Sequence, residues 1–254
     1  WLGARCHSAQ LSDLDLAKIW RGLWYCVWMC DKAPFQRELA TNISSFVHLF
    51  SEDKLDAFRF QTCFYETMRR DWIKIDKFRL NKYYSLIRHF LREGLKFCIV
   101  EGMVKVGLLM GLMSILRDEC LLQLPNGFRM HVADIFLCEA YIVFGTDMPT
   151  STLMILLEPW IKIVEFGEIP GQGIMSHLFI EAILKNIFKL LADFCPRTDR
   201  FEQEMEENPR KMYWAKIDLL PVQEMLQNSA KRPNKFSQGI VRIAALYKKI
   251  TKSE

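Results

Sequence analysis

The sequence is poor in the residues that tight turns require and in long apolar runs. It has only 12 Gly and 9 Pro in 254 residues, which disfavours an all-β protein with many turns. The longest charge-free apolar run, residues 106–116, is too short to span a membrane, so we expect a soluble protein with no membrane partner. No signal peptide is recognisable. Because the chain begins at Trp1, we expect a fragment or trimmed form whose N-terminal targeting cannot be judged.

Recognisable metal-binding spacings are also missing. The eight cysteines include no Cys-x-x-Cys, and the five histidines include neither His-Glu-x-x-His nor a His-x3-His pair. Cys26 and Cys30, with Cys6 and His7 upstream, come nearest to a zinc site, but they lack a second close pair. Cysteines that pack as small hydrophobes are therefore favoured. Since disulfide frameworks belong to small secreted domains, we expect a reduced, intracellular protein.

Motifs for covalent or cofactor chemistry are equally scarce. There is no Gly-x-Ser-x-Gly and no Gly-rich phosphate loop. Gly102, Gly107 and Gly111 fall within a helical pattern, where we expect them to allow close helix packing. We therefore predict that the chain is not an enzyme and has no cofactor and no small-molecule substrate.

The residues that are abundant predict a folded chain. Half are hydrophobic, 13% are aromatic and 25% are charged, whereas disorder requires the opposite balance. The net charge of +4 permits a nucleic-acid partner without requiring one.

A helical period is clearest in "KIWRGLWYCVWMCDK", residues 18–32. Trp20, Trp24 and Trp28 recur every four residues and coincide with an apolar stripe, so we predict that they pack inward between helices. Ser12, followed three residues later by Asp15, resembles a capping box at the start of this helix.

The same period continues through most of the chain. Pro34 interrupts the chain, and we expect a second helix after it that includes Leu39 to Phe50. Further helices are expected from a Ser51 cap to about Arg70, and over 76–92, 100–116, 129–144, 149–165, 172–195 and 236–252. Pro159 should end or kink its helix at Glu158, and no strand pair is credible. These helices predict antiparallel helix pairs, arranged either as a compact bundle or as an α-solenoid. Residues 196–235 are expected to be a loosely packed excursion.

Residues 69–96 carry nine Lys/Arg against three Asp/Glu. On a helix starting near Asp76, one face gathers Lys74, Lys77, Asn81, Arg88 and Arg92, with the aromatic Tyr84 among them. Such a basic stripe suits phosphate contact and base stacking, although a solvated outer face would look the same. Asp76 is interpreted as an N-cap that Arg79 bridges, a structural role.

The C-terminal stretch is basic as well. Its candidate contact residues are Lys231, Arg232, Lys235, Lys248 and Lys249, opposite an apolar packing stripe. The two basic segments together favour RNA or an acidic protein as the partner over a small molecule.

Four ordered motifs resemble the ribosomal RNA-processing protein 1 family. They are residues 18–32, "WIKIDKFRLNKYYSLIR" (72–88), "LPNGFRMHVADIFLCEA" (124–140) and "LLEPWIKIV" (156–164), and the resemblance covers about residues 10–195.

The resemblance implies a nucleolar, non-catalytic helical-repeat scaffold that joins pre-60S particles, supports pre-rRNA processing, and binds assembly factors and ribosomal RNA. We therefore predict an all-α fold of antiparallel helix pairs stacked as an irregular, armadillo/HEAT-like α-solenoid. The expected divisions are a helical-repeat domain over 1–195, the excursion over 196–235, and a basic C-terminal helix over 236–254 docked on the same domain. The alternative is a general armadillo/HEAT-type adaptor for peptides or cargo.

Overall fold

The computed structural model describes residues 11–50, 53–169, 173–195, 214, 217–231 and 236–251. The chain forms two compact units, Trp1–Val132 and Ala133–Glu254, and each is described by itself. Among the described residues, no helix combines the length and the apolar character that a membrane crossing requires.

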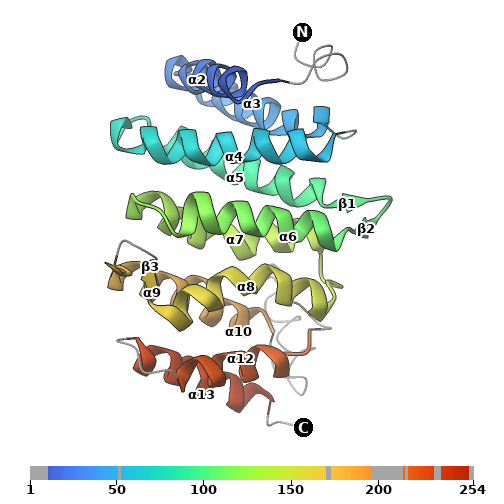
Figure 1. The fold of residues 1–254 in the computed structure, drawn as a ribbon, viewed down its shortest axis with the longest axis vertical. Coiled ribbons are helices and arrows are strands. Elements are labelled where there is room, and N and C mark those ends of the chain that lie inside the picture. The colour runs from blue at the N-terminus through green and yellow to red at the C-terminus, as the bar shows by residue number, and fades with distance from the viewer. Residues whose placement is uncertain are drawn as a thin grey trace. The chain divides into compact units, whose positions relative to one another are not determined.

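The first unit is built from helices that run back and forth (Figure 1). Its elements are α2 (Asp13–Met29), α3 (Ala33–Ser45) with the 3-10 turn η1 (Phe46–Phe50), α4 (Lys54–Asp71) with the 3-10 turn η2 (Trp72–Lys74), α5 (Leu80–Phe97), α6 (Val106–Ile115) with the π-helical η3 (Leu116–Leu121), and the start of α7 (Asn126–Phe144). Helix α2 packs on α4, α3 on α5, and α4 on α6 and η3. Each helix therefore buries one face against another helix.

The second unit repeats this kind of packing. It comprises the end of α7, α8 (Thr150–Phe166), α9 (His177–Ile183), the π-helical η4 (Leu184–Lys189), α10 (Leu190–Phe194), α12 (Leu220–Ala230) and α13 (Ser237–Thr251). Helix α8 packs on α9 and α12, while α13 packs on α12, η4 and α10. The helical content and the helix–helix packing within each unit confirm the predicted all-α, α-solenoid class of fold.

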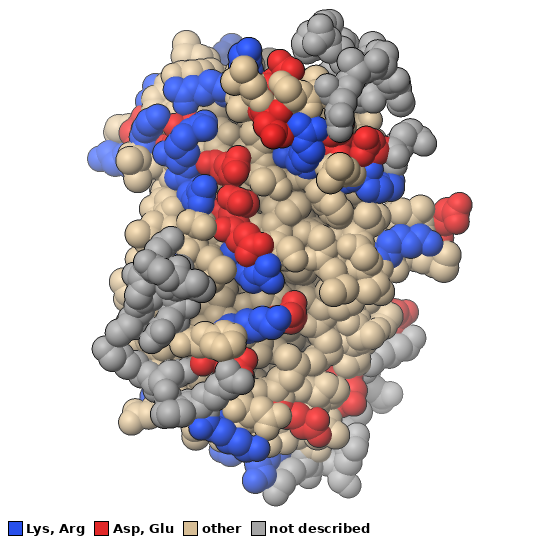
Figure 2. Space-filling view, viewed as in Figure 1, with Lys and Arg blue, Asp and Glu red and all other residues tan. Residues whose placement is uncertain are grey.

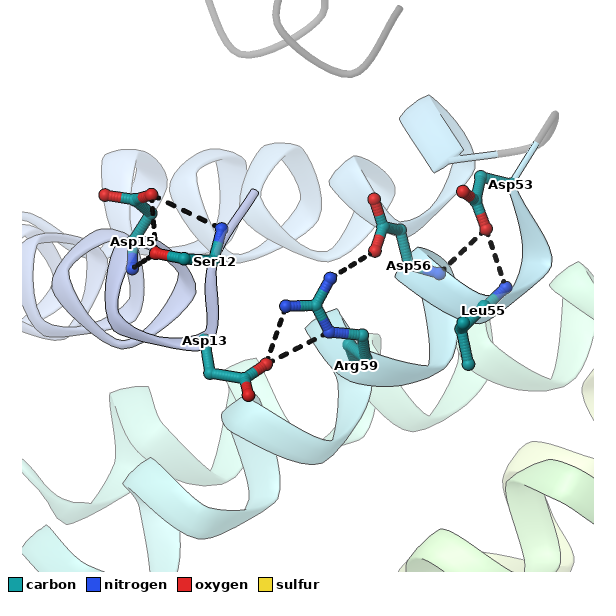
Figure 3. Close-up of polar contacts among 7 residues, drawn as sticks. All are labelled: Ser12, Asp13, Asp15, Asp53, Leu55, Asp56 and Arg59. Atoms are coloured by element: carbon teal, nitrogen blue, oxygen red, sulfur yellow. Dashed lines mark hydrogen bonds and ion pairs between the residues drawn. The ribbon is translucent and has the colours of Figure 1, made fainter. Parts of the chain in front are cut away.

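Side-chain caps fix where two helices of the first unit begin (Figure 3). Ser12 and Asp15 form the predicted capping box: the Ser12 Oγ accepts from the Asp15 N–H at 3.1 Å, and the Ser12 N–H donates to Asp15 at 3.3 Å. The cap of α4 is Asp53, whose Oδ1 accepts from Leu55 N at 3.0 Å and Asp56 N at 3.1 Å. Ser51, which the sequence suggested as this cap, lies outside the described residues.

A cluster of aromatic rings forms the centre of the first unit. Trp20 is completely buried; its indole N–H donates to the Phe60 carbonyl at 2.9 Å, and its ring lies 4.7 Å from Phe60 and 4.9 Å from Phe64. Trp24 is also buried, and Trp28 is half-buried and stacks on Trp24 at 4.8 Å. Two of the three tryptophans of this stretch thus lie inside the first unit, and the third lies partly at its surface.

Two short hairpins contradict the expectation that no strands pair. Ile99–Val100 pairs with Met103–Val104, and Glu168–Ile169 pairs with Gly173–Ile174, both antiparallel. Helix α6 therefore begins at Val106 rather than at residue 100. The turn of the first hairpin has positive φ at Glu101 and Gly102, a conformation that a two-residue hairpin loop requires and that ends the helical period.

Of the three glycines that were predicted to allow close helix packing, one does so. A Cβ on Gly111 would lie 2.5 Å from the ring of Phe58, so this glycine does allow α4 and α6 to pack closely. Gly107 has open space around its Cα, and Gly102 lies in the hairpin turn.

Two predicted helix boundaries differ from the structure. Pro159 does not end α8, which continues to Phe166 because its buried residues, Leu156, Leu157 and Trp160 among them, hold it in the core. The kink, which was the alternative at Pro159, stays a prediction. Helix α5 starts at Leu80, four residues after Asp76. Helix α12 lies inside the range 196–235: Pro221 is in its first turn, where proline is tolerated, and Val222 and Leu226 are buried. Most of the rest of that range lies outside the described residues, so the loosely packed excursion stays a prediction.

The two units are a division by packing, and the predicted domains over 1–195, 196–235 and 236–254 stay a prediction. The boundary between the units falls after Val132, within α7. The predicted boundary at residue 195 instead separates α10 from α12 and α13, although α13 packs on α10.

Candidate functional site

The buried carboxylate of Asp71, at the end of α4, organises a cluster of cations. The Asp71 side chain is 0% exposed and accepts from Arg21 at 2.7 Å, Arg70 at 3.0 Å and Lys74 at 2.6 Å. The three cationic side chains are 39–53% exposed. One inaccessible negative charge thus holds three accessible positive charges in fixed positions.

The carboxylate stays ionised in this position. Burial alone raises the pKa of Asp71, but the hydrogen bonds from Lys74, Arg70 and Arg21 outweigh burial and hold that pKa below its ordinary value. The same contact with Asp71 raises the pKa of Arg21. Asp71 therefore keeps its negative charge, and Arg21 its positive charge, in the neutral range.

A shallow hollow of about 460 Å³ lies beside this cluster. It is lined by Ala17, Lys18 and Arg21 of α2 together with Arg70 and Lys74. Figure 2 shows Lys and Arg side chains gathered at the upper left, over the ends of α2 and α4, with acidic side chains beside them. The lining of the hollow is cationic, and such a lining holds an anion.

The segment after α4 extends this surface along α2. This segment consists of residues 72–79. At its end, the guanidinium of Arg79 lies 4.4 Å from the centroid of the Trp28 ring. Arg21 and Trp28 are seven residues apart, so they share one face of α2, about 10 Å apart along the helix. The segment therefore lies alongside that face.

We call the set Lys18, Arg21, Tyr25, Arg70, Lys74, Lys77, Phe78 and Arg79 the α2–α4 surface. Six of its members are cations. The carboxylates in contact with them are those of Asp71, which is buried, and of Asp76, which forms an ion pair with Arg79.

Aromatic rings accompany these cations. The Arg21 guanidinium lies 4.8 Å from the ring centroid of Tyr25, whose residue is 47% exposed, and the Lys77 ammonium lies 5.0 Å from that of Phe78. Phe78 and Ile73, at 84% and 80%, are the most exposed large apolar residues in the described part of the chain. A single exposed apolar residue is ordinary; two in one eight-residue segment among cations form a defined surface.

The structure divides the basic stripe that was predicted on residues 69–96. Lys74 and Lys77 precede α5, so the helical period does not align them with Arg88 and Arg92, which are half-buried on α5. Arg79 bonds to Asp76 as predicted, and Asp76 accepts from the backbone N–H of Arg79 at 3.1 Å without being the N-cap of α5.

Two other side chains of residues 69–96 make contacts within the fold. Tyr84, which was placed among the stripe cations, stacks on His131 at 4.0 Å. Lys82 is buried and donates to the carbonyls of Trp28 at 2.6 Å and Cys30 at 2.9 Å. It therefore caps the C-terminal end of α2.

The C-terminal candidates lie in the second unit. Lys231, Lys248 and Lys249 are exposed, and α13 buries Ile240, Ala244 and Tyr247 on its opposite side. Arg232 and Lys235 lie outside the described residues.

Sequence reasoning missed Lys18, Arg21 and Arg70. Arg21 meets Asp71 across 50 residues of chain, a separation that helical periodicity cannot bridge. The one local signal is spacing: Lys18 and Arg21 are three residues apart on α2, so they share a helix face. Lys74 lies in η2, beyond the end of the helix α4 that carries Arg70.

The cysteines have the environment of packing residues. Burial raises the pKa of Cys63 to about 11 and that of Cys98 and Cys195 to about 12, so these thiols are protonated at neutral pH and are poor nucleophiles and ligands. Cys26 is exposed and Cys30 half-buried. Within the described ranges, no three His, Cys, Asp or Glu side chains are grouped so that they could hold a metal ion; Cys6 and His7 lie outside those ranges.

Comparison with known proteins gives a consistent result. A family model described as "Nucleolar protein,Nop52" matches residues 1–228. Ribosomal RNA processing protein 1 homolog B of Homo sapiens is 33% identical over 210 residues, covering 81% of this chain and 26% of that protein. Homolog A of Mus musculus is 34% identical over 185 residues, covering 72% of this chain and 36% of that protein. The homolog of Caenorhabditis elegans is 24% identical over 241 residues, covering 93% of this chain and 59% of that protein.

The chain thus spans 26% to 38% of the length of the human and mouse relatives that it matches. The family match also extends beyond residue 195, where the sequence motifs stopped, and includes most of α12. The resemblance that the four sequence motifs indicated is confirmed, and the chain belongs to the Nop52 family of nucleolar proteins.

Proposed function

We propose that this chain is a non-catalytic scaffold domain that acts in ribosomal RNA processing and in assembly of the pre-60S ribosomal subunit in the nucleolus. Its partners are other assembly factors and ribosomal RNA. Family membership supports the process, because the family is described as nucleolar and the relatives are named for ribosomal RNA processing.

The observation that carries the proposal is the α2–α4 surface. The buried Asp71 bonds to Arg21, Arg70 and Lys74, whose side chains remain partly exposed to solvent. Several cations fixed close together bind a partner that carries several negative charges. The hollow beside it presents cations rather than an acid–base pair, which suits binding rather than catalysis. Among the remaining candidates, Arg88, Arg92, Lys231, Arg232, Lys235, Lys248 and Lys249 are proposed as secondary contacts.

A general peptide-binding adaptor is less well supported. Such an adaptor would present a ladder of Trp and Asn side chains on a concave face. Here Trp20, Trp24 and Trp160 are instead buried in helix packing, so these tryptophans cannot reach a peptide.

Sedimentation of cell extracts tests the proposal. The tagged protein should co-sediment with pre-60S particles and co-purify with large-subunit rRNA precursors and assembly factors. A variant in which Lys18 and Lys77, both exposed on the α2–α4 surface, are replaced by Glu should shift toward the light fractions. A matched control replaces Lys162 and Lys189, which are 47% and 56% exposed in the second unit, by Glu. Absence of the unmodified protein from pre-60S fractions would refute the proposal.

A further inference from the structure

The α2–α4 surface combines two features that single-stranded nucleic acid requires: fixed cations for the backbone and exposed rings for the bases. Its cations are Lys18, Arg21, Arg70, Lys74, Lys77 and Arg79, and its accessible rings are Tyr25 and Phe78. We propose that this surface binds single-stranded RNA, with backbone phosphates at the hollow and a base stacked on Phe78. The inference rests on the proposed function, in which ribosomal RNA is a partner.

The phosphate subsite is the hollow between α2 and the end of α4. Arg21, Arg70 and Lys74 are positioned by Asp71 before any ligand arrives, so little side-chain entropy is lost when a phosphate binds. Lys18 lines the same hollow one turn earlier on α2. Because Asp71 neutralises only one of these four charges, the subsite retains an excess of positive charge.

The stacking subsite is the segment between Asp71 and Arg79. Phe78 is 84% exposed and Lys77 lies over its ring, a combination of π-face and cation that stacks a base. Trp28 is a poorer platform, because it is half-buried and both Arg79, at 4.4 Å, and Trp24, at 4.8 Å, lie against its ring. Lys18 and Trp28 are ten residues apart, so the surface runs about 15 Å along α2.

Single-stranded RNA fits this surface better than an acidic helix does. A helix that docks on a protein needs an apolar groove for its anchor residues. The hollow is lined by four cations and Ala17, which offer no such groove. Duplex RNA also fits poorly, because its stacked bases are not available to Phe78.

Fluorescence anisotropy of the purified chain with a labelled twelve-nucleotide single-stranded RNA tests the inference. The affinity should fall about tenfold or more in Phe78→Ala, the scale of one lost base stack, with no change in the salt dependence. The Lys18→Ala, Lys77→Ala double variant should instead lower the slope of log K against log salt by about 1.4, since each phosphate contact contributes about 0.7. Circular dichroism should show an unchanged fold, because these side chains are exposed.

Matched controls lie in the second unit. Phe166→Ala removes a ring that is 55% exposed, and the Lys162→Ala, Lys189→Ala double variant removes two exposed cations; both should bind as the unmodified chain does. A Phe78→Ala affinity within twofold of the original would overturn the inference. So would equal affinity for a duplex of the same length, or binding of a polyglutamate peptide but not of RNA. If the purified chain fails to bind RNA while the protein still co-sediments with pre-60S particles, the inference fails and the proposed function stands.

Discussion

Replacing Trp20 by Ala should strongly destabilise the first unit. Trp20 is completely buried, and its ring contacts Phe60, Phe64 and Phe90 at centroid distances of 4.7, 4.9 and 5.3 Å. Truncating a fully buried tryptophan costs about 3–5 kcal/mol. The indole N–H bond to the Phe60 carbonyl contributes about 1 kcal/mol more, so we expect a total loss of about 4–6 kcal/mol.

Trp28 provides an internal comparison. It is half-buried at the end of the same helix and stacks on Trp24. Because part of its surface stays in water in the folded chain, Trp28→Ala should cost only about 1–2 kcal/mol. The two variants remove the same atoms from one helix, so the difference between them measures burial.

Native-state hydrogen exchange followed by mass spectrometry measures the effect. Trp20→Ala should speed amide exchange in α2, α4 and α5, whose residues surround the indole, and leave α12 and α13 of the second unit unchanged. A cost for Trp20→Ala equal to or below that of Trp28→Ala would refute the account of the core. Trp20→Phe should recover most of the loss, since it restores the apolar contacts.

Three further predictions concern single contacts. Lys82→Met should cost about 1–3 kcal/mol in urea unfolding, because it leaves the Trp28 carbonyl without this donor, whereas the Cys30 carbonyl keeps its bond from Gln36. The same change at an exposed lysine, Lys185→Met, should change stability by less than about 0.5 kcal/mol. Gly111→Ala should lower the melting temperature, because its Cβ would meet the ring of Phe58, whereas Gly107→Ala should raise it by removing a flexible glycine from open space. The pKa of Glu93 is lowered to about 2 by its hydrogen bond with His48 and then by Lys96; its stabilisation is complete above the ordinary value of 4.5 and is lost as the pH falls toward 2. The melting temperature of Glu93→Gln should therefore vary less between pH 5 and pH 2 than that of the unmodified chain, and parallel curves would contradict this.

Helices could be predicted from the sequence because their signals are local. The stripe through Trp20 and Trp24 and the capping box at Ser12 each occupy a few turns of chain, and the structure contains the helix that they predict. The hairpin at 99–104 was missed because residues 100 to 116 continue an apolar period, and only the Glu101-Gly102 turn breaks it. Pro159 was overestimated, since a local rule cannot register the buried surroundings of α8.

The candidate site was only half predictable for the same reason. Lys74 and Lys77 were found because they lie in a locally basic stretch. Their neighbours Arg21 and Lys18 come from a helix about 50 residues earlier, and only the fold brings them to Asp71. The sequence also could not show that Lys82 is buried while Lys74 is exposed, because both occur in the same basic run.

Crosslinking of RNA to the protein within purified pre-60S particles tests the central claim most directly. Ultraviolet irradiation followed by mass spectrometry of the RNA–peptide adducts identifies the residues that touch bases. We predict adducts in α2 near Tyr25 and in the segment around Phe78, with loss of the latter in Phe78→Ala. Two results would contradict the account. One is that adducts form only on other surfaces, such as α13. The other is that the peptides of α2 and of the segment around Phe78 are recovered in full without any crosslinked RNA.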